Sequence, residues 1–177
     1  MTFTPETSVL LLVDLQARLM PAIADSDAVV ANALRLARAA RLLGVPVLGT
    51  EQNPEGLGPN VAEIREACTR TLSKQTFDAT REAAWASFLP PDRPDIVVAG
   101  CEAHVCVLQT VMGLRRSSAP VRLVRDAIGS RVTASRDAAA HRAEVHGAEL
   151  VTTEMVIFEW LASAQHPRFR EALRLVK

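Results

Sequence analysis

A cysteine placed near the start of a predicted helix is the first candidate for chemistry. Cys106 follows a buried strand and a turn that contains Gly100. The free N–H groups and the helix dipole at such a position favour the thiolate, which is the nucleophilic form of cysteine. The same N–H groups can bind the oxyanion of a tetrahedral intermediate. A small buried packing residue is the alternative, and it is the better interpretation of Cys68 and Cys101.

Two charged residues follow apolar stretches. Asp14 ends an apolar strand, where a buried carboxylate costs free energy unless it is paired or used. It is either a catalytic group or a helix cap or structural ion pair. Gln16, two residues further on, would point the same way from an extended segment. Lys74 ends a short apolar stretch, and a lysine in this position is more often solvated than functional.

The histidines do not suggest a metal site. His141 and His146 lie five residues apart on a predicted helix and do not share a face, and His166 precedes a proline in a predicted turn. His104 is the one histidine placed to serve Cys106 as a base, and a structural role for it is favoured. No glycine-rich phosphate loop occurs, so neither nucleotide nor other cofactor is predicted.

Short apolar runs alternate with helical patterns along the whole chain. This alternation predicts one domain over residues 1–177, a three-layer α/β/α fold with a mostly parallel central sheet. Ligands bind such sheets outside the carboxyl ends of the strands, which directs attention to Asp14, residues 50–53, residues 100–106 and Asp126. The expected strands are residues 8–14, 45–50, 69–73, 95–99, 121–125 and 149–152. The expected helices are residues 27–43, 81–89, 105–116, 134–146, 154–163 and 167–176.

The composition excludes several classes of protein. The chain has 177 residues, of which 49% are hydrophobic, and twenty basic residues balance twenty acidic ones. A net charge of zero argues against binding to nucleic acid or to an anionic membrane surface. No apolar run is long enough to span a membrane. Three cysteines are an odd number and favour free thiols in a reducing, cytoplasmic setting.

Several segments together resemble the isochorismatase-like cysteine hydrolases. Three of them resemble the signatures of that superfamily: LLLVDLQARL, the lysine-containing LSKQTFDA, and VVAGCEAHVCVLQT. Two more, TEQNPEGLG and HPRFREALRLVK, are similar to the short isochorismatase domain-containing proteins. The resemblance covers nearly the whole chain, with the segments in the same order.

The resemblance implies a role for each matching residue. Cys106 matches the nucleophile, Asp14 the carboxylate that accepts its proton, and Lys74 the ammonium that stabilises the ionised thiol. The backbone N–H groups of Glu102 and Cys106 match the oxyanion hole, with a cis peptide bond between Cys101 and Glu102. A covalent thioester intermediate, hydrolysed by water, follows from this set.

Departures from the superfamily pattern narrow the expected substrate. The Asp-x-His metal segment of the nicotinamidases is missing, so neither metal dependence nor nicotinamide is expected. A retained Cys106 favours a small amide, ureido or related acyl compound. Phe77 is followed by Asp78 where serine is familiar, and the place of this carboxylate is left open. The expected pocket-lining residues are Gln16, Leu19, Phe77 and Trp85.

Two other classes of function remain open at this stage. One is a catalytically idle scaffold that binds a small molecule or a partner. The other is a thiol redox protein in which Cys101 would resolve Cys106. The resemblance also implies a homo-oligomer, with the apolar C-terminal helices that carry Trp160 and Phe169 as the expected interface.

Overall fold

Six parallel strands form the centre of the structure, a computed structural model that describes residues 3–177. Their order is β3-β2-β1-β4-β5-β6, so the chain builds outward from β1 in one direction and then from β4 in the other. The order therefore reverses between β1 and β4, which is where parallel sheets bind ligands. The strands are β1 (Ser8–Val13), β2 (Val47–Gln52), β3 (Arg70–Lys74), β4 (Asp95–Cys101), β5 (Val121–Gly129) and β6 (Glu149–Val151).

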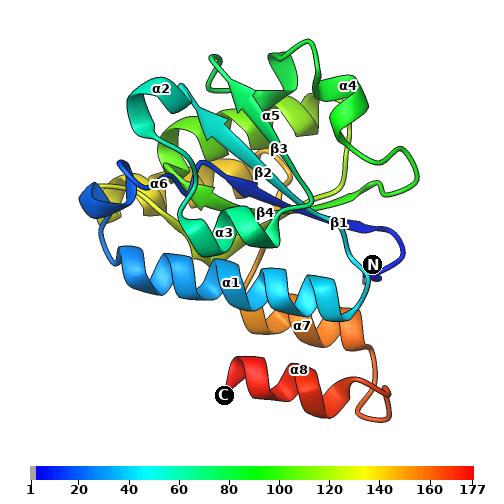
Figure 1. Cartoon of the computed structure of the whole chain (residues 1–177). Helices are drawn as coiled ribbons and strands as arrows, with labels where there is room; N and C mark the ends of the chain where they lie inside the picture. Colours follow the sequence, from blue (N-terminus) through cyan, green and yellow to red (C-terminus); the bar gives the residue numbers. More distant parts are fainter. Residues whose placement is uncertain (1–2) are drawn as a thin grey trace.

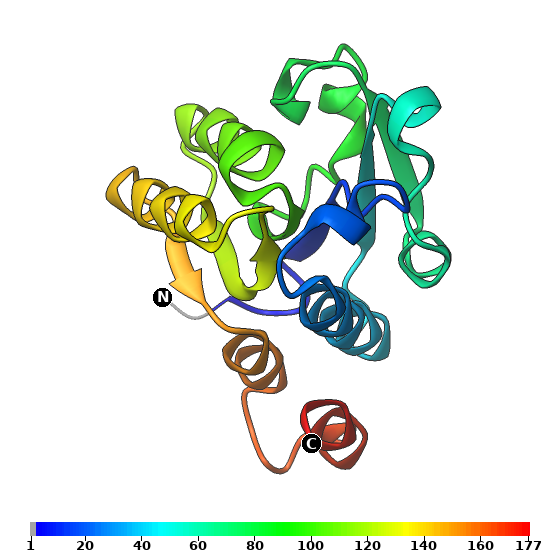
Figure 2. The ribbon, with the colours of Figure 1, turned by 90° about the vertical axis from the view of Figure 1, so that its left-hand side faces the viewer.

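Helices cover both faces of the sheet, as Figures 1 and 2 show. One face carries α1 (Ser26–Leu42), α3 (Ala62–Ala67), α7 (Thr153–Leu161) and α8 (Phe169–Val176). The other carries α4 (Trp85–Phe88), α5 (Leu108–Arg116) and α6 (Thr133–Val145). The shorter elements are η1 (Met20–Ala22), α2 (Pro54–Leu57), η2 (Ala79–Arg81) and the π-helical turn η3 (Ala103–Val107). The three-layer α/β/α prediction is confirmed.

Strand β1 shows why continuous apolar runs form the centre of this sheet. All six of its residues are buried. Leu10 and Leu12 pack into the core beneath α1, whereas Val9, Leu11 and Val13 pack into the core beneath α5. Because successive side chains of a strand point to opposite faces, a strand between two helical layers needs apolar residues at every position.

Several element boundaries differ from those expected. Strand β5 continues to Gly129, past the charged Arg125 and Asp126, because Gly100 and Cys101 of β4 pair with its far end. The helix expected over residues 105–116 begins as the π-helical turn η3, and residues 81–89 divide into η2 and α4. The short helices α2 and α3 were not predicted, since the glycines and prolines around them favour a loop.

The aromatic residues of the C-terminal helices lie in the core of the chain itself or pack against it. Trp160 is only 1% exposed, donates its indole N–H to Ser8 Oγ at 3.0 Å, and meets the Phe3 ring edge-on. Phe169 packs against Phe158, with ring centroids 6.3 Å apart. The expectation that Trp160 forms an intermolecular surface was therefore wrong. Within residues 3–177, no helix is long and apolar enough to cross a membrane.

Candidate active site

The candidate site lies where β1 and β4 end side by side. At this point Gly100 has φ +125°, and a Cβ atom on it would lie 2.0 Å from the carbonyl oxygen of Val13. Only glycine permits so close an approach of the two backbones. The next residue on the β1 side, Asp14, has φ +48° and leaves the strand direction. Its carboxylate consequently turns into the site.

Asp14 and Lys74 form a fully buried ion pair. Lys74 Nζ lies 2.8 Å from Asp14 Oδ2, and both side chains are 0% exposed. The other carboxylate oxygen, Oδ1, accepts a hydrogen bond of 2.6 Å from Thr50 Oγ1 on β2. Since a buried charge is tolerated only when it is paired and hydrogen-bonded, these contacts explain how Asp14 can stand at the end of an apolar strand.

The Lys74 ammonium uses all three of its N–H donors within the protein. Besides Asp14, it donates to Gln52 Oε1 at 2.7 Å and to the Thr76 carbonyl at 3.3 Å. Strand pairing produces part of this arrangement, because Gln52 and Lys74 are register partners at the ends of β2 and β3. Lys74 is thus held as a fixed positive charge inside the site.

Cys106 places its thiol against this network. Its Sγ lies 3.8 Å from Gln52 Oε1, and the residue is 6% exposed. Burial raises the pKa of the Cys106 thiol to about 12, the Asp14 carboxylate also raises this pKa, and the Lys74 ammonium lowers it. Cys106 therefore carries its proton at neutral pH. Cys106 was expected near the start of a helix, but it lies within the π-helical turn η3, before α5 begins.

The turn that precedes Cys106 has an unusual backbone. The peptide bond between Cys101 and Glu102 is cis, as the family resemblance implied. The Glu102 carboxylate accepts hydrogen bonds from the Arg131 backbone N–H at 3.0 Å and from Arg131 Nε at 3.1 Å. This contact fastens the turn to the segment that follows β5.

Comparison with known proteins identifies the family. The family described as "Isochorismatase domain" matches residues 8–155. The chain belongs to the isochorismatase family. The mouse isochorismatase domain-containing protein 2A is 36% identical over 173 residues, which cover 98% of this chain and 84% of that protein. The human isochorismatase domain-containing protein 2 shows the same identity and coverage. Membership places the chain among the hydrolases of this superfamily.

Solved structures have the same fold. The structure of MAR1 ribonuclease from Caenorhabditis elegans is 31% identical, with a TM-score of 0.93 and coverage of 99% of this chain and 92% of that one. The YcaC gene product of Escherichia coli, described as an octameric hydrolase of unknown specificity, has a TM-score of 0.88 at 22% identity. The alignment covers 98% of this chain and 95% of the YcaC chain. The recognition of the family and of its fold is confirmed.

Gln52 and Thr50 belong to this isochorismatase-family site; both lie in residues 50–53, the strand end at which a ligand was expected, but neither was assigned a role. Gln52 joins Lys74 to the thiol, and its Nε2 donates to the Gln75 carbonyl at 2.8 Å. The signal that was available is the one that marked Asp14, namely polar residues at the end of a buried strand. What it did not reveal is which neighbouring side chain each one contacts.

Gln16 has a different position from the one expected. Its Nε2 donates to the carbonyls of Gln52 and Gly58, at 3.0 and 2.6 Å, and its Oε1 accepts from the Gln52 N–H at 2.8 Å. Because Asp14 has a positive φ, the segment is not extended there, so the condition on which Gln16 was expected to point with Asp14 does not hold. Gln16 ties β2 to the loop after α2 and thereby supports Gln52.

The three apolar residues that were expected to line the pocket differ in what they pack against and in how exposed they are. Leu19 packs against the core beneath α1, whereas Trp85 packs against Phe88 and the core beneath α5. Phe77 is 50% exposed and follows Lys74 by three residues. Of the three, Phe77 is the most exposed, whereas Leu19 and Trp85 are half-buried.

Two residues whose roles were open now have partners outside the thiol network. His104 Nδ1 lies 2.9 Å from Ser130 Oγ, in agreement with the structural role that was favoured. Asp78 accepts a hydrogen bond from the Thr80 backbone N–H and forms an ion pair of 2.7 Å with Arg116. Asp78 therefore anchors the loop after Lys74 to α5.

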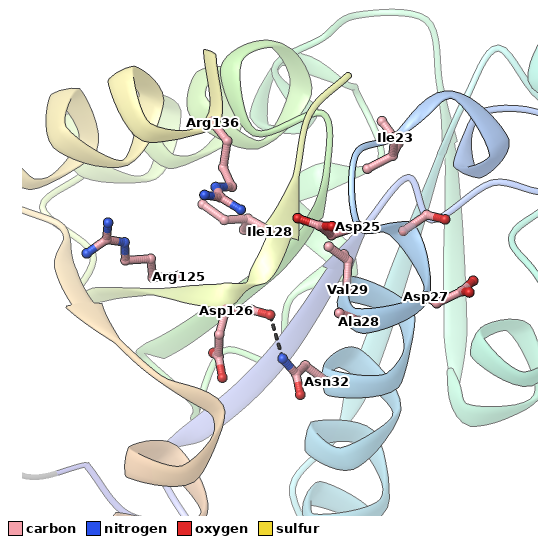
Figure 3. Close-up of a pocket in the computed structure, with 11 residues that line it drawn as sticks. Ile23, Asp25, Asp27, Ala28, Val29, Asn32, Arg125, Asp126, Ile128 and Arg136 are labelled. Carbon is pink, nitrogen blue, oxygen red and sulfur yellow. Dashed lines mark hydrogen bonds between the residues drawn. The ribbon is translucent and has the colours of Figure 1, made fainter. Parts of the chain in front are cut away.

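A separate cavity of about 640 Å³ lies between the start of α1 and the far end of β5 (Figure 3). Its wall includes Asp126, whose carboxylate accepts from the Thr153 N–H and hydroxyl and whose carbonyl accepts from Asn32 Nδ2. Asp126 thus caps α7, and none of the three candidate catalytic residues lines this cavity.

Among residues 3–177, no group of three or more His, Cys, Asp or Glu side chains is arranged to hold a metal ion.

Proposed function

We propose that this isochorismatase-family member is a metal-independent cysteine hydrolase that acts on a small amide, ureido or related acyl compound. The observation that carries the proposal is the contact of one buried thiol, Cys106, with a buried carboxylate–ammonium pair, Asp14 and Lys74. A base, a nucleophile and a fixed positive charge then stand together, which is the arrangement that covalent acyl transfer requires.

In the proposed first step the thiol proton moves to Asp14 while Sγ attacks the carbonyl carbon of the substrate. The new C–S bond forms as the electron pair of the C=O bond moves onto oxygen, and the N–H groups of Glu102 and Cys106 bind that oxyanion. The C–N bond then breaks as the leaving nitrogen takes the proton from Asp14. A water molecule then attacks the resulting thioester, its oxygen bonds to the carbonyl carbon as the C–S bond breaks, and one of its protons restores the Cys106 thiol as the acid is released.

The raised pKa of Cys106 supports this order of events. Because the resting thiol is neutral, its proton has to be removed as the substrate is attacked, and Asp14 is the carboxylate that acts electrostatically on it. Lys74 lowers the pKa of the thiol and so favours the anion that forms in this step. Asp14 thus raises the pKa of the Cys106 thiol and can accept its proton, whereas Lys74 lowers this pKa and stabilises the thiolate.

The donor set also supports a mechanism without metal. In the region where nicotinamidases carry their Asp-x-His segment, this chain has Glu51, Gln52 and Asn53. Glu51 accepts from the Asn60 backbone N–H at 2.8 Å, and Gln52 is committed to Lys74. No step of the proposal needs a cofactor.

We further propose that the enzyme works in the cytoplasm and as a homo-oligomer.

The rival functions receive less support from the geometry. A redox pair would need an accessible second thiol, but Cys101 is 0% exposed. An idle scaffold would not need a buried ion pair beside a cysteine. RNA hydrolysis is suggested by the description of the relative from Caenorhabditis elegans, yet this chain has no net charge with which to attract RNA.

The test is a screen of the purified protein against amides, carbamoyl compounds, esters and RNA, before and after prolonged EDTA treatment. We expect turnover of an acyl compound that survives EDTA and does not respond to added zinc. Cys106→Ala should abolish it while changing the free energy of unfolding by no more than about 1–2 kcal/mol. Cys68→Ala is the matched control and should keep full activity. Turnover by Cys106→Ala at the wild-type rate would rule out the cysteine mechanism, and a loss on chelation that zinc reverses would rule out metal independence.

A further inference from the structure

Three arginines line a small cavity whose lining includes none of Asp14, Lys74 and Cys106. The cavity has a volume of about 280 Å³ and lies between η2, α5 and α6. Arg81 comes from η2, Arg116 from the last turn of α5 and Arg142 from α6. The residues that line it are Asp78, Arg81, Leu108, Gln109, Met112, Arg116 and Arg142.

The charge in this cavity is unbalanced. Three guanidinium groups face one carboxylate, so the lining residues carry three positive charges less one negative charge, or +2. The whole chain, in contrast, has twenty basic and twenty acidic residues. An excess of positive charge in a concave site favours the binding of an anion.

The single carboxylate does not satisfy the three guanidinium groups. Asp78 Oδ2 pairs with Arg116 Nη2 at 2.7 Å and more distantly with Arg81 Nε at 3.7 Å. Its other oxygen accepts from the N–H and hydroxyl of Thr80, at 3.0 and 2.6 Å. The side chain of Arg142 makes no hydrogen bond or ion pair with any residue in 3–177. Several guanidinium donors are therefore available to a ligand.

The position of Asp78 is fixed by the backbone of α5. A Cβ atom on Gly113 would lie 2.4 Å from Asp78 Oδ1 and 2.4 Å from Thr80 Oγ1, so only glycine allows the loop to approach this closely. The carboxylate is consequently not free to move across the cavity toward Arg142. Arg81 and Arg116, with side chains 71% and 58% exposed, are free to adjust to a ligand.

We propose that Arg81, Arg116 and Arg142 form a binding site for a dianionic phosphoryl group. The planar guanidinium donates two parallel hydrogen bonds, which match the oxygens of phosphate. Leu108 and Met112 add an apolar wall on which the organic part of a small phosphomonoester would pack. None of Asp14, Lys74 and Cys106 lines the cavity, so the proposed binding site does not include the candidate catalytic residues.

Isothermal titration of the purified full-length chain tests this proposal, with inorganic phosphate and with phenyl phosphate, each at constant ionic strength in sodium chloride. We expect saturable binding of a phosphoryl compound to the wild type. The double variant R81Q/R142Q should raise the Kd at least about tenfold, which corresponds to about 1.4 kcal/mol, since it removes two guanidinium groups that would donate charge-assisted hydrogen bonds. Arg116 is left in place because Asp78 depends on it.

The matched control is R170Q/R174Q, which removes two exposed arginines of α8 on the opposite side of the sheet and should leave the Kd unchanged. Tighter binding of phenyl phosphate would identify a phosphomonoester as the ligand, and equal or tighter binding of inorganic phosphate would identify the free anion. The absence of saturable binding for both compounds, or the same Kd in the wild type and R81Q/R142Q, would overturn the proposal. Neither result depends on catalytic turnover.

Discussion

Lys74 Nζ lies 2.8 Å from Asp14 Oδ2, and neither side chain is exposed to solvent. The two residues come from β3 and from the end of β1, sixty positions apart in the sequence. Taking both charges out of water costs free energy, which their mutual attraction and their hydrogen bonds to Thr50, Gln52 and Thr76 have to offset. Each partner is therefore tolerated only while the other is present.

Lys74→Met should destabilise the protein by about 3–5 kcal/mol, because it leaves the Asp14 carboxylate buried without a counter-charge. The double variant Asp14→Asn/Lys74→Met, which buries no charge, should recover part of that loss. Urea unfolding of the wild type, both single variants and the double variant gives the coupling between the two residues. Strictly additive losses would show that the pair does not act as a unit.

The rate of labelling of Cys106 by iodoacetamide should rise with pH without a plateau up to about pH 10, because the thiol has a pKa of about 12. Lys74→Met should move this profile to higher pH, since the ammonium lowers the pKa of the thiol. Asp14→Asn should move it to lower pH, since the carboxylate raises that pKa. Turnover by Asp14→Asn should nevertheless fall by several orders of magnitude, because the proton acceptor is lost. Labelling is followed by mass spectrometry of the peptide that contains Cys106, and three superimposable profiles would contradict the assignment.

Gln52→Ala should lower kcat/KM and also slow the labelling of Cys106, because Lys74 loses an acceptor and is held less firmly beside the thiol. Thr69→Ala is a suitable control, since its hydroxyl bonds the Val47 carbonyl at the other end of β2. If Gln52→Ala behaved like Thr69→Ala in both measurements, Gln52 would have no role in positioning Lys74.

Stability should fall steeply between about pH 9 and pH 12. Burial raises the pKa of Cys68, Cys101 and Cys106 from 9.0 to about 12, so the unfolded chain releases these protons first and is favoured as the pH rises. Each thiol contributes about 1.4 kcal/mol per pH unit in that range. The chain contains no tyrosine, which would otherwise titrate in the same window.

Cys101→Ala isolates one of these contributions. Urea unfolding at pH 8 and pH 10 should show a smaller loss of stability in Cys101→Ala than in the wild type, by about 1.4 kcal/mol for the unit between pH 9 and pH 10. Equal losses in the two proteins would show that the Cys101 thiol ionises as readily in the folded chain as in the unfolded one.

The sequence predicted the parts of this molecule that local patterns encode. The apolar run of β1 and the helical periodicity of α1 are local properties, and the three charged or reactive residues of the site stood in recognisable segments. The partners of Gln52 were not predictable in this way. They depend on the register between β2 and β3, which pairs Gln52 with Lys74, and register is a property of two strands together.

Backbone conformation accounts for most of the remaining differences. The side chain of Gln16 would lie beside that of Asp14 if the segment were extended, but the positive φ of Asp14 turns it toward the loop after α2. The extension of β5 past Asp126 likewise depends on its neighbour β4 rather than on its own residues. The burial of Trp160 could not be read from α7 alone, because the side chain bonds Ser8 at the opposite end of the chain.

Strand β3 lies at the edge of the sheet, with β2 as its one neighbour, and three of its five residues are exposed. Edge elements of this kind detach by local fluctuations that leave the rest of a protein folded. Such an opening would withdraw the ammonium from the thiol while β1 and β4 kept Asp14 and Cys106 in place. On warming, catalytic activity should then be lost at a lower temperature than the helical circular dichroism signal. The backbone amide hydrogens of β3 should exchange with solvent well before those of β1.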